Sequence, residues 1–155
     1  MKNKRTVAHN FAQGIHVLVI ATLLAGLALS LAPAQVARAI DPADYTVTKV
    51  GDTNDGTCDV SDCSLREAIT AANAAGGHQS IDLPAGTYTL TRTSSGEDGN
   101  VWGDLDITDD VTINGAGAET TIIDGNGTDR VLHVFSSATV VVGDVTIRNG
   151  KADDG

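Results

Sequence analysis

The chain has 155 residues, enough for one domain of ordinary size. Ten Lys and Arg stand against twenty Asp and Glu, which gives a formal net charge of −10. Residues 1–39 hold four of the cations and no carboxylate, so the remaining chain carries a net charge of −14. This acidity, without any cluster of Lys and Arg, excludes non-specific binding of nucleic acid and disfavours anionic membrane surfaces.

Residues 1–39 have the layout of a secretory signal peptide. A basic start is followed by an apolar run of 17 residues from Ile15 to Leu31, and Ala37-Arg38-Ala39 offers a cleavage site. A retained membrane anchor is the alternative, but this run is marginal for a hydrocarbon core of about 30 Å. No second long apolar run follows, so we expect a secreted or cell-surface protein whose mature chain has no membrane segment.

Export decides how the two cysteines are interpreted. Residues 40–63 contain a predicted strand at 45–50 and a loop with Cys58 and Cys63. In an oxidising compartment these cysteines are expected to form a disulfide. A structural zinc site needs four ligands, and two cysteines do not supply them.

The same loop is rich in carboxylates that are candidate calcium ligands. The spacing is not that of an EF-hand, because Gly56 comes one residue early and no Glu stands at position twelve. The alternative is a solvated acidic turn held by the disulfide, so we assign no cofactor and keep calcium as a candidate only. The candidate ligands are Asp52, Asp55, Asp59 and Asp62.

Residues 64–77 predict one short amphipathic helix. Ser64 stands three residues before Glu67, which is the spacing of a capping box, and Gly76 and Gly77 are typical of a helix C-terminus. The helix is expected over 65–75. Its apolar face follows the i, i+3, i+4, i+7 pattern and consists of Leu65, Ala68, Ile69 and Ala72.

In residues 78–155 apolar residues recur at every second position, in place of the spacing of 3.6 residues seen in the helix. This pattern predicts short strands separated by turns rich in Gly, Asn and Asp. No segment of helical length lies between them, so βαβ units are excluded. The expected strands are 81–83, 87–91, 105–107, 111–113, 120–123, 131–135, 139–142 and 145–147. Both an antiparallel sandwich or barrel and a parallel solenoid fit this pattern.

An internal repeat favours the solenoid. The segment starting at Leu105 can be laid over the segment starting at Leu132. Ile107 then falls on Val134, Val111 falls near Val140, and the pair 122–123 falls near 145–147. Each of the two units holds three short strands, as the coils of a triangular solenoid would.

The string CSLREAI at residues 63–69 resembles the signature of the CSLREA family of bacterial proteins. The motifs that follow in order, IDLPAGTYTL, GDLDIT, VTINGAG, TIIDGNG and VTIRNG, extend the resemblance over residues 45–150. It implies a secreted or cell-surface right-handed parallel β-helix, an all-β fold with a short capping helix, and it supplies no reaction. On this interpretation Arg66 is either a contact residue on the protein surface or the partner of a nearby carboxylate. The end of the chain at KADDG suggests a fragment of a longer protein.

The expected function is a non-catalytic, exported module with an adhesive or structural role, whose partners are polysaccharide or other surface proteins. The alternative is a polysaccharide lyase or hydrolase of the pectin-degrading type. A lyase site would use Asp106 and Asp110 with Arg130 or Arg148, but Asp is also an ordinary residue of tight turns. His133 is expected to face outward from its strand and Trp102 to anchor a loop, so no catalytic residue is assigned.

Overall fold

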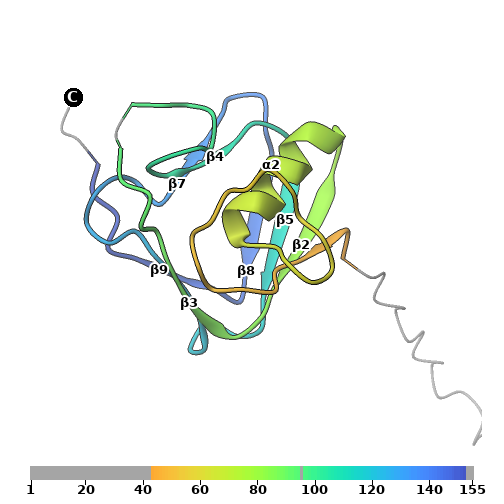
Figure 1. Cartoon of the computed structure of the whole chain (residues 1–155), viewed down its shortest axis with the longest axis horizontal. Coiled ribbons are helices and arrows are strands. Elements are labelled where there is room, and N and C mark those ends of the chain that lie inside the picture. Colours follow the sequence, from red (N-terminus) through yellow and green to blue (C-terminus); the bar gives the residue numbers. More distant parts are fainter. Residues whose placement is uncertain (1–42, 95, 153–155) are drawn as a thin grey trace, which may run out of the picture. The chain divides into compact units, whose positions relative to one another are not determined.

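The computed structural model describes residues 43–94 and 96–152, so the expected signal peptide lies outside the described residues (Figure 1). In this part of the chain one helix and nine short strands follow one another. They are β1 (Tyr45–Thr46), α2 (Leu65–Ala75), β2 (Gln79–Leu83), β3 (Gly86–Thr89), β4 (Leu105–Ile107), β5 (Val111–Gly115), β6 (Thr121–Asp124), β7 (Leu132–Val134), β8 (Val140–Gly143) and β9 (Thr146–Arg148). No helix among the described residues is long and apolar enough to cross a membrane.

Helix α2 has the expected bounds and the expected N-terminal cap. The Ser64 hydroxyl accepts a hydrogen bond from the Glu67 amide at 3.1 Å, and the Glu67 carboxylate accepts one from the Ser64 amide at 2.7 Å. Each of these bonds satisfies a backbone N–H that the first turn of a helix leaves free. At the other end Gly76 has a φ of 74°, a conformation that glycine adopts without steric cost.

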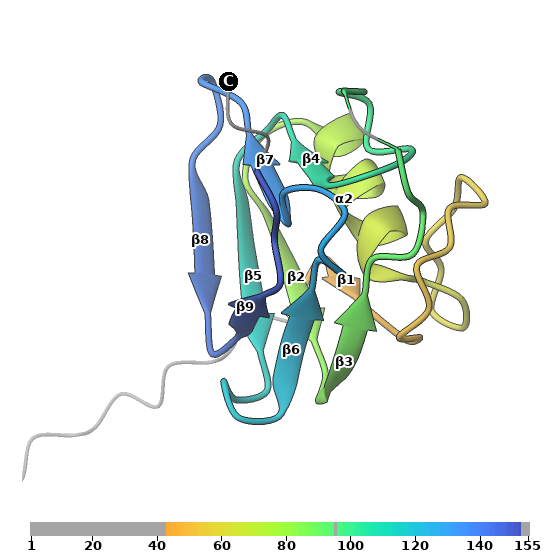
Figure 2. The same cartoon turned by 90° about the vertical axis from the view of Figure 1, so that its left-hand side faces the viewer.

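The strands form three sheets in which every recorded pairing is parallel (Figure 2). From β2 onward, successive strands enter the three sheets in rotation. The sheet orders are β1-β2-β5-β8, β3-β6-β9 and β4-β7. The antiparallel sandwich or barrel is therefore wrong for this part of the chain, which is a strand-rich fold with parallel sheets and one short helix.

The register predicted from the internal repeat is confirmed. Ile107 pairs with Val134, and Val111 pairs with Val140. In the third sheet, residues 122–124 pair with residues 146–148. The alignment could be found from sequence because a shift of one residue would turn every core side chain toward solvent.

The hydrophobic core lies between the sheets and is built from aligned aliphatic side chains. Ile81 pairs with Ile113, and both are fully buried. The next strand in that sheet places Val142 beside Ile113, where it is only partly buried. The strands furthest along the chain also leave Ile147 exposed, so burial decreases from β2 toward β9.

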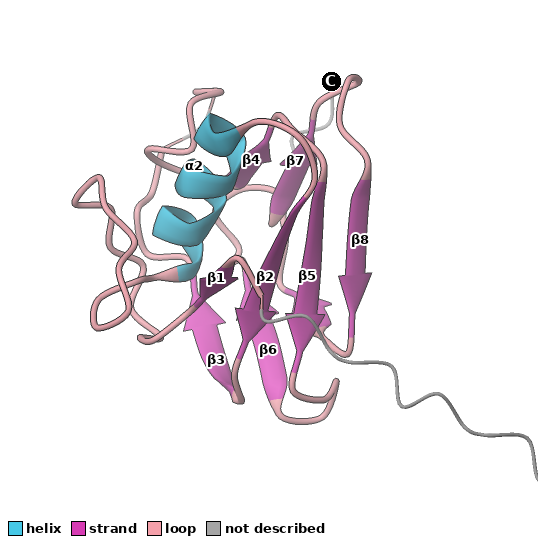
Figure 3. Ribbon diagram, turned by 90° about the vertical axis from the view of Figure 1, so that its right-hand side faces the viewer, coloured by secondary structure: helices cyan, strands magenta, loops and turns pink. Residues whose placement is uncertain are grey.

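Helix α2 packs against β1, β2 and β4 (Figure 3). The predicted apolar face is buried, with Ala68 and Ile69 fully inaccessible. The next two helical positions after Leu65 are buried as well, although they are the charged Arg66 and Glu67. The buried face is therefore wider than the apolar stripe alone predicts.

The first expected strand is shorter than predicted. Only Tyr45 and Thr46 pair with β2, whereas the sequence pattern suggested a strand over 45–50. The amides of Thr48 and Lys49 donate instead to the carbonyl of Cys63. The chain leaves the sheet at this point because its backbone pairs with the segment that leads into α2.

Candidate functional site

The candidate site begins with the outward face of β4. Leu105 and Ile107 point into the core, so the alternation of side chains along a strand puts Asp104 and Asp106 on the opposite face. Such a face would ordinarily be exposed to solvent. Asp104 and Asp106 are nevertheless 1% and 0% exposed, because the loop before β4 and helix α2 cover them.

Arg66 attaches that loop to α2. Its guanidinium donates to the backbone carbonyl oxygens of Gly103 at 2.8 Å and Asp104 at 2.9 Å. The same group forms an ion pair with Asp52, with Nε and Oδ1 separated by 2.7 Å. Arg66 thus pairs with a carboxylate, one of its two expected roles, but it is buried and not a surface contact.

Two asparagine side chains complete the edge of β4 that does not pair with β7. The Asn73 amide donates to the Asp106 carbonyl at 2.9 Å and accepts from the Thr108 amide at 3.0 Å. The Asn100 side chain accepts from the Asp106 amide at 3.3 Å and donates to the Arg66 carbonyl. A carboxamide carries one donor and one acceptor group in the arrangement of a peptide bond, so these side chains substitute for a neighbouring strand.

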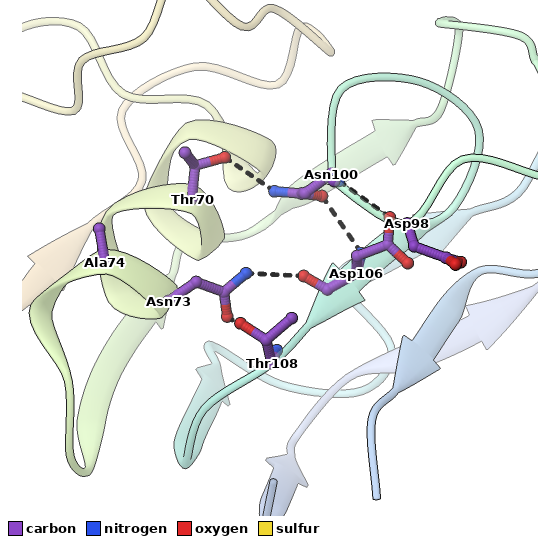
Figure 4. A pocket seen from close by; sticks show the side chains of 8 residues that line it. Thr70, Asn73, Ala74, Asp98, Asn100, Asp106 and Thr108 are labelled. Carbon is purple, nitrogen blue, oxygen red and sulfur yellow. Dashed lines mark hydrogen bonds between the residues drawn. The ribbon is translucent and has the colours of Figure 1, made fainter. Parts of the chain in front are cut away.

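A cavity of about 270 Å³ lies between α2, the loop and the end of β4 (Figure 4). Most of the residues that line it have polar side chains, and Asp98 and Asp106 are among them. The lining residues are Thr70, Asn73, Ala74, Asp98, Gly99, Asn100, Asp106 and Thr108.

Asp106 and His133 stand side by side because they are register partners on β4 and β7. The His133 Nδ1 atom lies 3.0 Å from Asp106 Oδ1 and 3.5 Å from Asp98 Oδ1. The His133 ring also packs on Phe135, with ring centroids 4.4 Å apart. His133 lies on the strand face opposite the core, as predicted, and its partner carboxylates come from a strand and a loop.

The surroundings of Asp106 favour its neutral form. Burial raises the pKa of Asp106, and the nearby charges of Asp104 and Glu97 raise it further. Hydrogen bonds from the Asn100 amide and from His133 act in the opposite direction. The balance leaves a buried carboxyl group whose charge is only partly compensated by the protein.

Among the described residues, one group of three side chains has the composition of a metal site. Asp98, Asp106 and His133 each offer one ligand atom, and these atoms lie within 4.8 Å of one another. Carboxylate oxygens and an imidazole nitrogen are ligands for divalent cations. The same three groups could also exchange a proton.

The structure does not gather the four calcium candidates into one site. The Asp52 carboxylate is bound by Arg66 and by the amides of residues 91 and 92. The other three carboxylates each have partners of their own. Asp55 accepts from Thr57, Asp59 accepts from the amides of residues 61 and 62, and Asp62 forms an ion pair with Lys49. Their hydrogen bonds are those of an acidic turn, which is closed by the expected Cys58–Cys63 disulfide.

The side chains considered for a lyase site are also dispersed. Arg130 pairs with Asp104 at 2.7 Å, and Arg148 pairs with Asp124 at 2.8 Å. The Asp110 carboxylate accepts a hydrogen bond from the amide of residue 139. Asp106 therefore faces His133 and not an arginine, and the proposed cluster does not form in the described residues.

Trp102 anchors its loop through a cation–π contact, with the Arg92 guanidinium carbon 4.2 Å from the ring centroid. The sequence interpretation missed the parts played by Asn73, Asn100 and Asp98. The helical position of Asn73 gave no reason to connect it with a strand 33 positions away, and the turn that holds Asp98 and Asn100 carried no pattern that pointed to β4. Asn100 has a φ of 56°, which asparagine tolerates better than most residues, and its position after a Gly is the one local signal that marks it.

Comparison of the chain with family models, with curated proteins and with solved structures gives no match.

Proposed function

We propose that the chain is an exported, non-catalytic module of the cell surface or extracellular space, built as a right-handed parallel β-helix of the CSLREA type. The observation that carries this proposal is the order in which strands enter the sheets. Strands β2, β3 and β4 enter the three sheets in turn, and β5, β6 and β7 then pair with them in parallel. A chain that winds as a solenoid makes this pattern.

The side-chain ladders support the same interpretation. Tyr88, Ile123 and Ile147 occupy equivalent positions in β3, β6 and β9. Stacked positions of this kind bury one continuous core between neighbouring repeats. Connections between parallel strands of one sheet are right-handed in nearly all proteins, which supports the proposed hand.

Helix α2 would act as the cap of the solenoid. It contacts β1, β2 and β4, which belong to the earliest strands of their sheets. Asn73 and Asn100 also satisfy backbone groups on the free edge of β4. Covering an open edge in this way prevents pairing with other chains, and it gives the CSLREA segment a structural role.

The contacts of Asp104 and Asp124 favour a structural role for these two carboxylates over a catalytic one. Arg130 of one segment pairs with Asp104, 26 residues earlier, and Arg148 pairs with Asp124, 24 residues earlier. These ion pairs join neighbouring strands of the same sheet or the turns beside them. Hydrogen bonds from the turn at 126 and from the side chains of Arg148 and Asn149 lower the pKa of Asp124. A carboxylate held in this way is a poor proton donor for glycoside cleavage.

Export is supported by the layout of residues 1–39 and by the disulfide. The bond between Cys58 and Cys63 closes the loop that leads into α2. Disulfides persist in oxidising compartments and are rare in the cytosol. An acidic surface fits adhesion to cationic or calcium-bridged partners such as polysaccharides and surface proteins.

Export is tested by expressing the full chain with its own leader in a bacterial host and fractionating the cells. We expect the protein outside the cytoplasm, with its N-terminus at Ile40 by mass spectrometry and with both cysteines oxidised. Recovery of the uncleaved chain in the cytoplasm with free thiols would contradict the proposal.

Catalysis is tested by incubating the secreted chain with polygalacturonate and calcium while recording absorbance at about 235 nm, where unsaturated products absorb. Reducing-end release is measured in parallel, because a hydrolase gives no such absorbance. We expect neither signal. Activity that is lost in Asp106→Asn but kept in Asp82→Asn, a variant at an exposed strand position, would overturn the non-catalytic proposal.

A further inference from the structure

We propose that Asp98, Asp106 and His133 form a binding site for one zinc ion. The His133 Nδ1 atom lies 3.0 Å from Asp106 Oδ1 and 3.5 Å from Asp98 Oδ1. A tetrahedral zinc ion with bonds of about 2.1 Å holds its ligand atoms roughly 3.4 Å apart. The two separations from His133 are thus close to this spacing, and the two carboxylate ligand atoms lie within 4.8 Å of each other. Side-chain rotations would complete the geometry.

The Asp106 carboxylate is held in place before any ion binds. Its Oδ2 atom accepts a hydrogen bond from the Asn100 amide at 2.9 Å, while Oδ1 faces His133. Asn100 is itself anchored to α2 through the Arg66 carbonyl and the Thr70 hydroxyl. Hydrogen bonds of this kind to one oxygen of a carboxylate orient the other oxygen toward a metal.

The charges around the site favour a cation. Four carboxylates gather here, because Glu97 and Asp104 lie close enough to Asp106 to act on its charge, and Asp98 approaches the same imidazole. Two arginines lie nearby, but both already have carboxylate partners: Arg130 is bound to Asp104, and Arg66 is bound to Asp52. Apart from His133, the described structure gives Asp106 Oδ1 no hydrogen-bond partner, so the buried oxygen is available as a ligand.

The ligand types select the metal. Calcium takes six to eight oxygen ligands, whereas this site offers two carboxylates and one imidazole nitrogen. An imidazole with carboxylates suits zinc, which also accepts three protein ligands and one water molecule. Both carboxylates line the cavity of about 270 Å³, which has room for that water.

The test is titration of the full chain with Zn²⁺ alone, in metal-free buffer, by isothermal titration calorimetry. We expect one equivalent of Zn²⁺ that is lost, or weakened at least tenfold, in Asp98→Asn and in His133→Gln. The Asp98 side chain is 64% exposed, so its substitution leaves the fold intact and far-UV circular dichroism verifies this. The matched control is His78→Gln. His78 is an exposed imidazole that contacts Thr112 on β5, and β5 does not belong to the sheet of β4 and β7 that carries the proposed site.

Retention of the same stoichiometry and affinity in Asp98→Asn and His133→Gln would overturn the proposal, as would the absence of Zn²⁺ binding by the unmodified chain. Displacement of Zn²⁺ by equimolar Ca²⁺ would also overturn it, since an oxygen-only site prefers calcium. These outcomes are independent of the wound architecture and of export, and export is tested separately by fractionation.

Discussion

Replacing Arg66 by Met should release the loop before β4 from helix α2. The variant removes the ion pair with Asp52 and leaves the carbonyls of Gly103 and Asp104 without their donor. The Asp52 side chain is only 2% exposed, so its carboxylate stays buried with two backbone amides as partners. Removing one member of a buried ion pair costs about 3–5 kcal/mol.

A loss of this size is a large part of the stability of the domain. A folded unit of roughly 110 residues is expected to have a free energy of unfolding of about 6–16 kcal/mol. From the average unfolding entropy of such domains, 4 kcal/mol corresponds to a decrease in Tm of roughly 15–20 °C. Urea unfolding of the full chain, followed by far-UV circular dichroism, measures the free energy directly.

The matched control is Arg92→Met in the same loop. Arg92 donates to the Val101 carbonyl and stacks on Trp102 near the surface, so we expect a loss below about 1 kcal/mol. In the Arg66→Met background, the additional substitution Asp52→Asn should cost less than it does alone, because no buried charge then remains. An Arg66→Met variant within about 1 kcal/mol of the unmodified chain would refute the inferred role of this ion pair.

Two further predictions concern Glu67 and Gly115. Burial raises the pKa of Glu67, but hydrogen bonds from Ser64, Thr53 and Asp55 and the ion pair with Lys49 outweigh it, and the pKa falls from 4.5 to about 2. This lowered pKa contributes about 3 kcal/mol above pH 4.5, and that contribution is lost as the pH falls toward 2. Urea unfolding at several pH values should show this loss, and the same slope in Glu67→Gln would contradict it. A Cβ atom at Gly115 would overlap the Asp144 carbonyl oxygen, whereas one at Gly143 meets no atom within 4 Å. Gly115→Ala should therefore destabilise the chain by roughly 1–3 kcal/mol in urea unfolding. An equal effect of Gly143→Ala would show that the close approach of β5 to the turn between β8 and β9 is not the cause.

The parts of the fold that were predictable from the sequence depend on local periodicity. The capping box at Ser64 and the apolar stripe through Ile69 define α2 within one segment. The register of β4 on β7 followed from matching Ile107 with Val134, because the chain repeats its own pattern. Signals of this kind need no knowledge of distant contacts.

Only part of the candidate site was predictable. The register that matches Ile107 with Val134 also puts Asp106 beside His133, whereas Asp98 joins them only through the tertiary fold. Asp98 and His133 are 35 positions apart, and neither belongs to a recognisable motif. The helical pattern placed Arg66 beside an apolar stripe but gave no sign that a loop near residue 103 would bury it. The calcium candidates were close in sequence, yet Asp52 is bound by Arg66 and its neighbours by their own turn.

The side-chain amides of Asn73 and Asn100 make the two edges of the β4–β7 sheet different. Asn73 and Asn100 occupy the hydrogen-bonding groups of Asp106 and Thr108 that an incoming strand would need. Any added strand must displace both amides before it can dock there, while β7 on the other side pairs with no further strand among the described residues. Addition of a strand on the β4 side of this sheet is thus opposed by these side-chain hydrogen bonds.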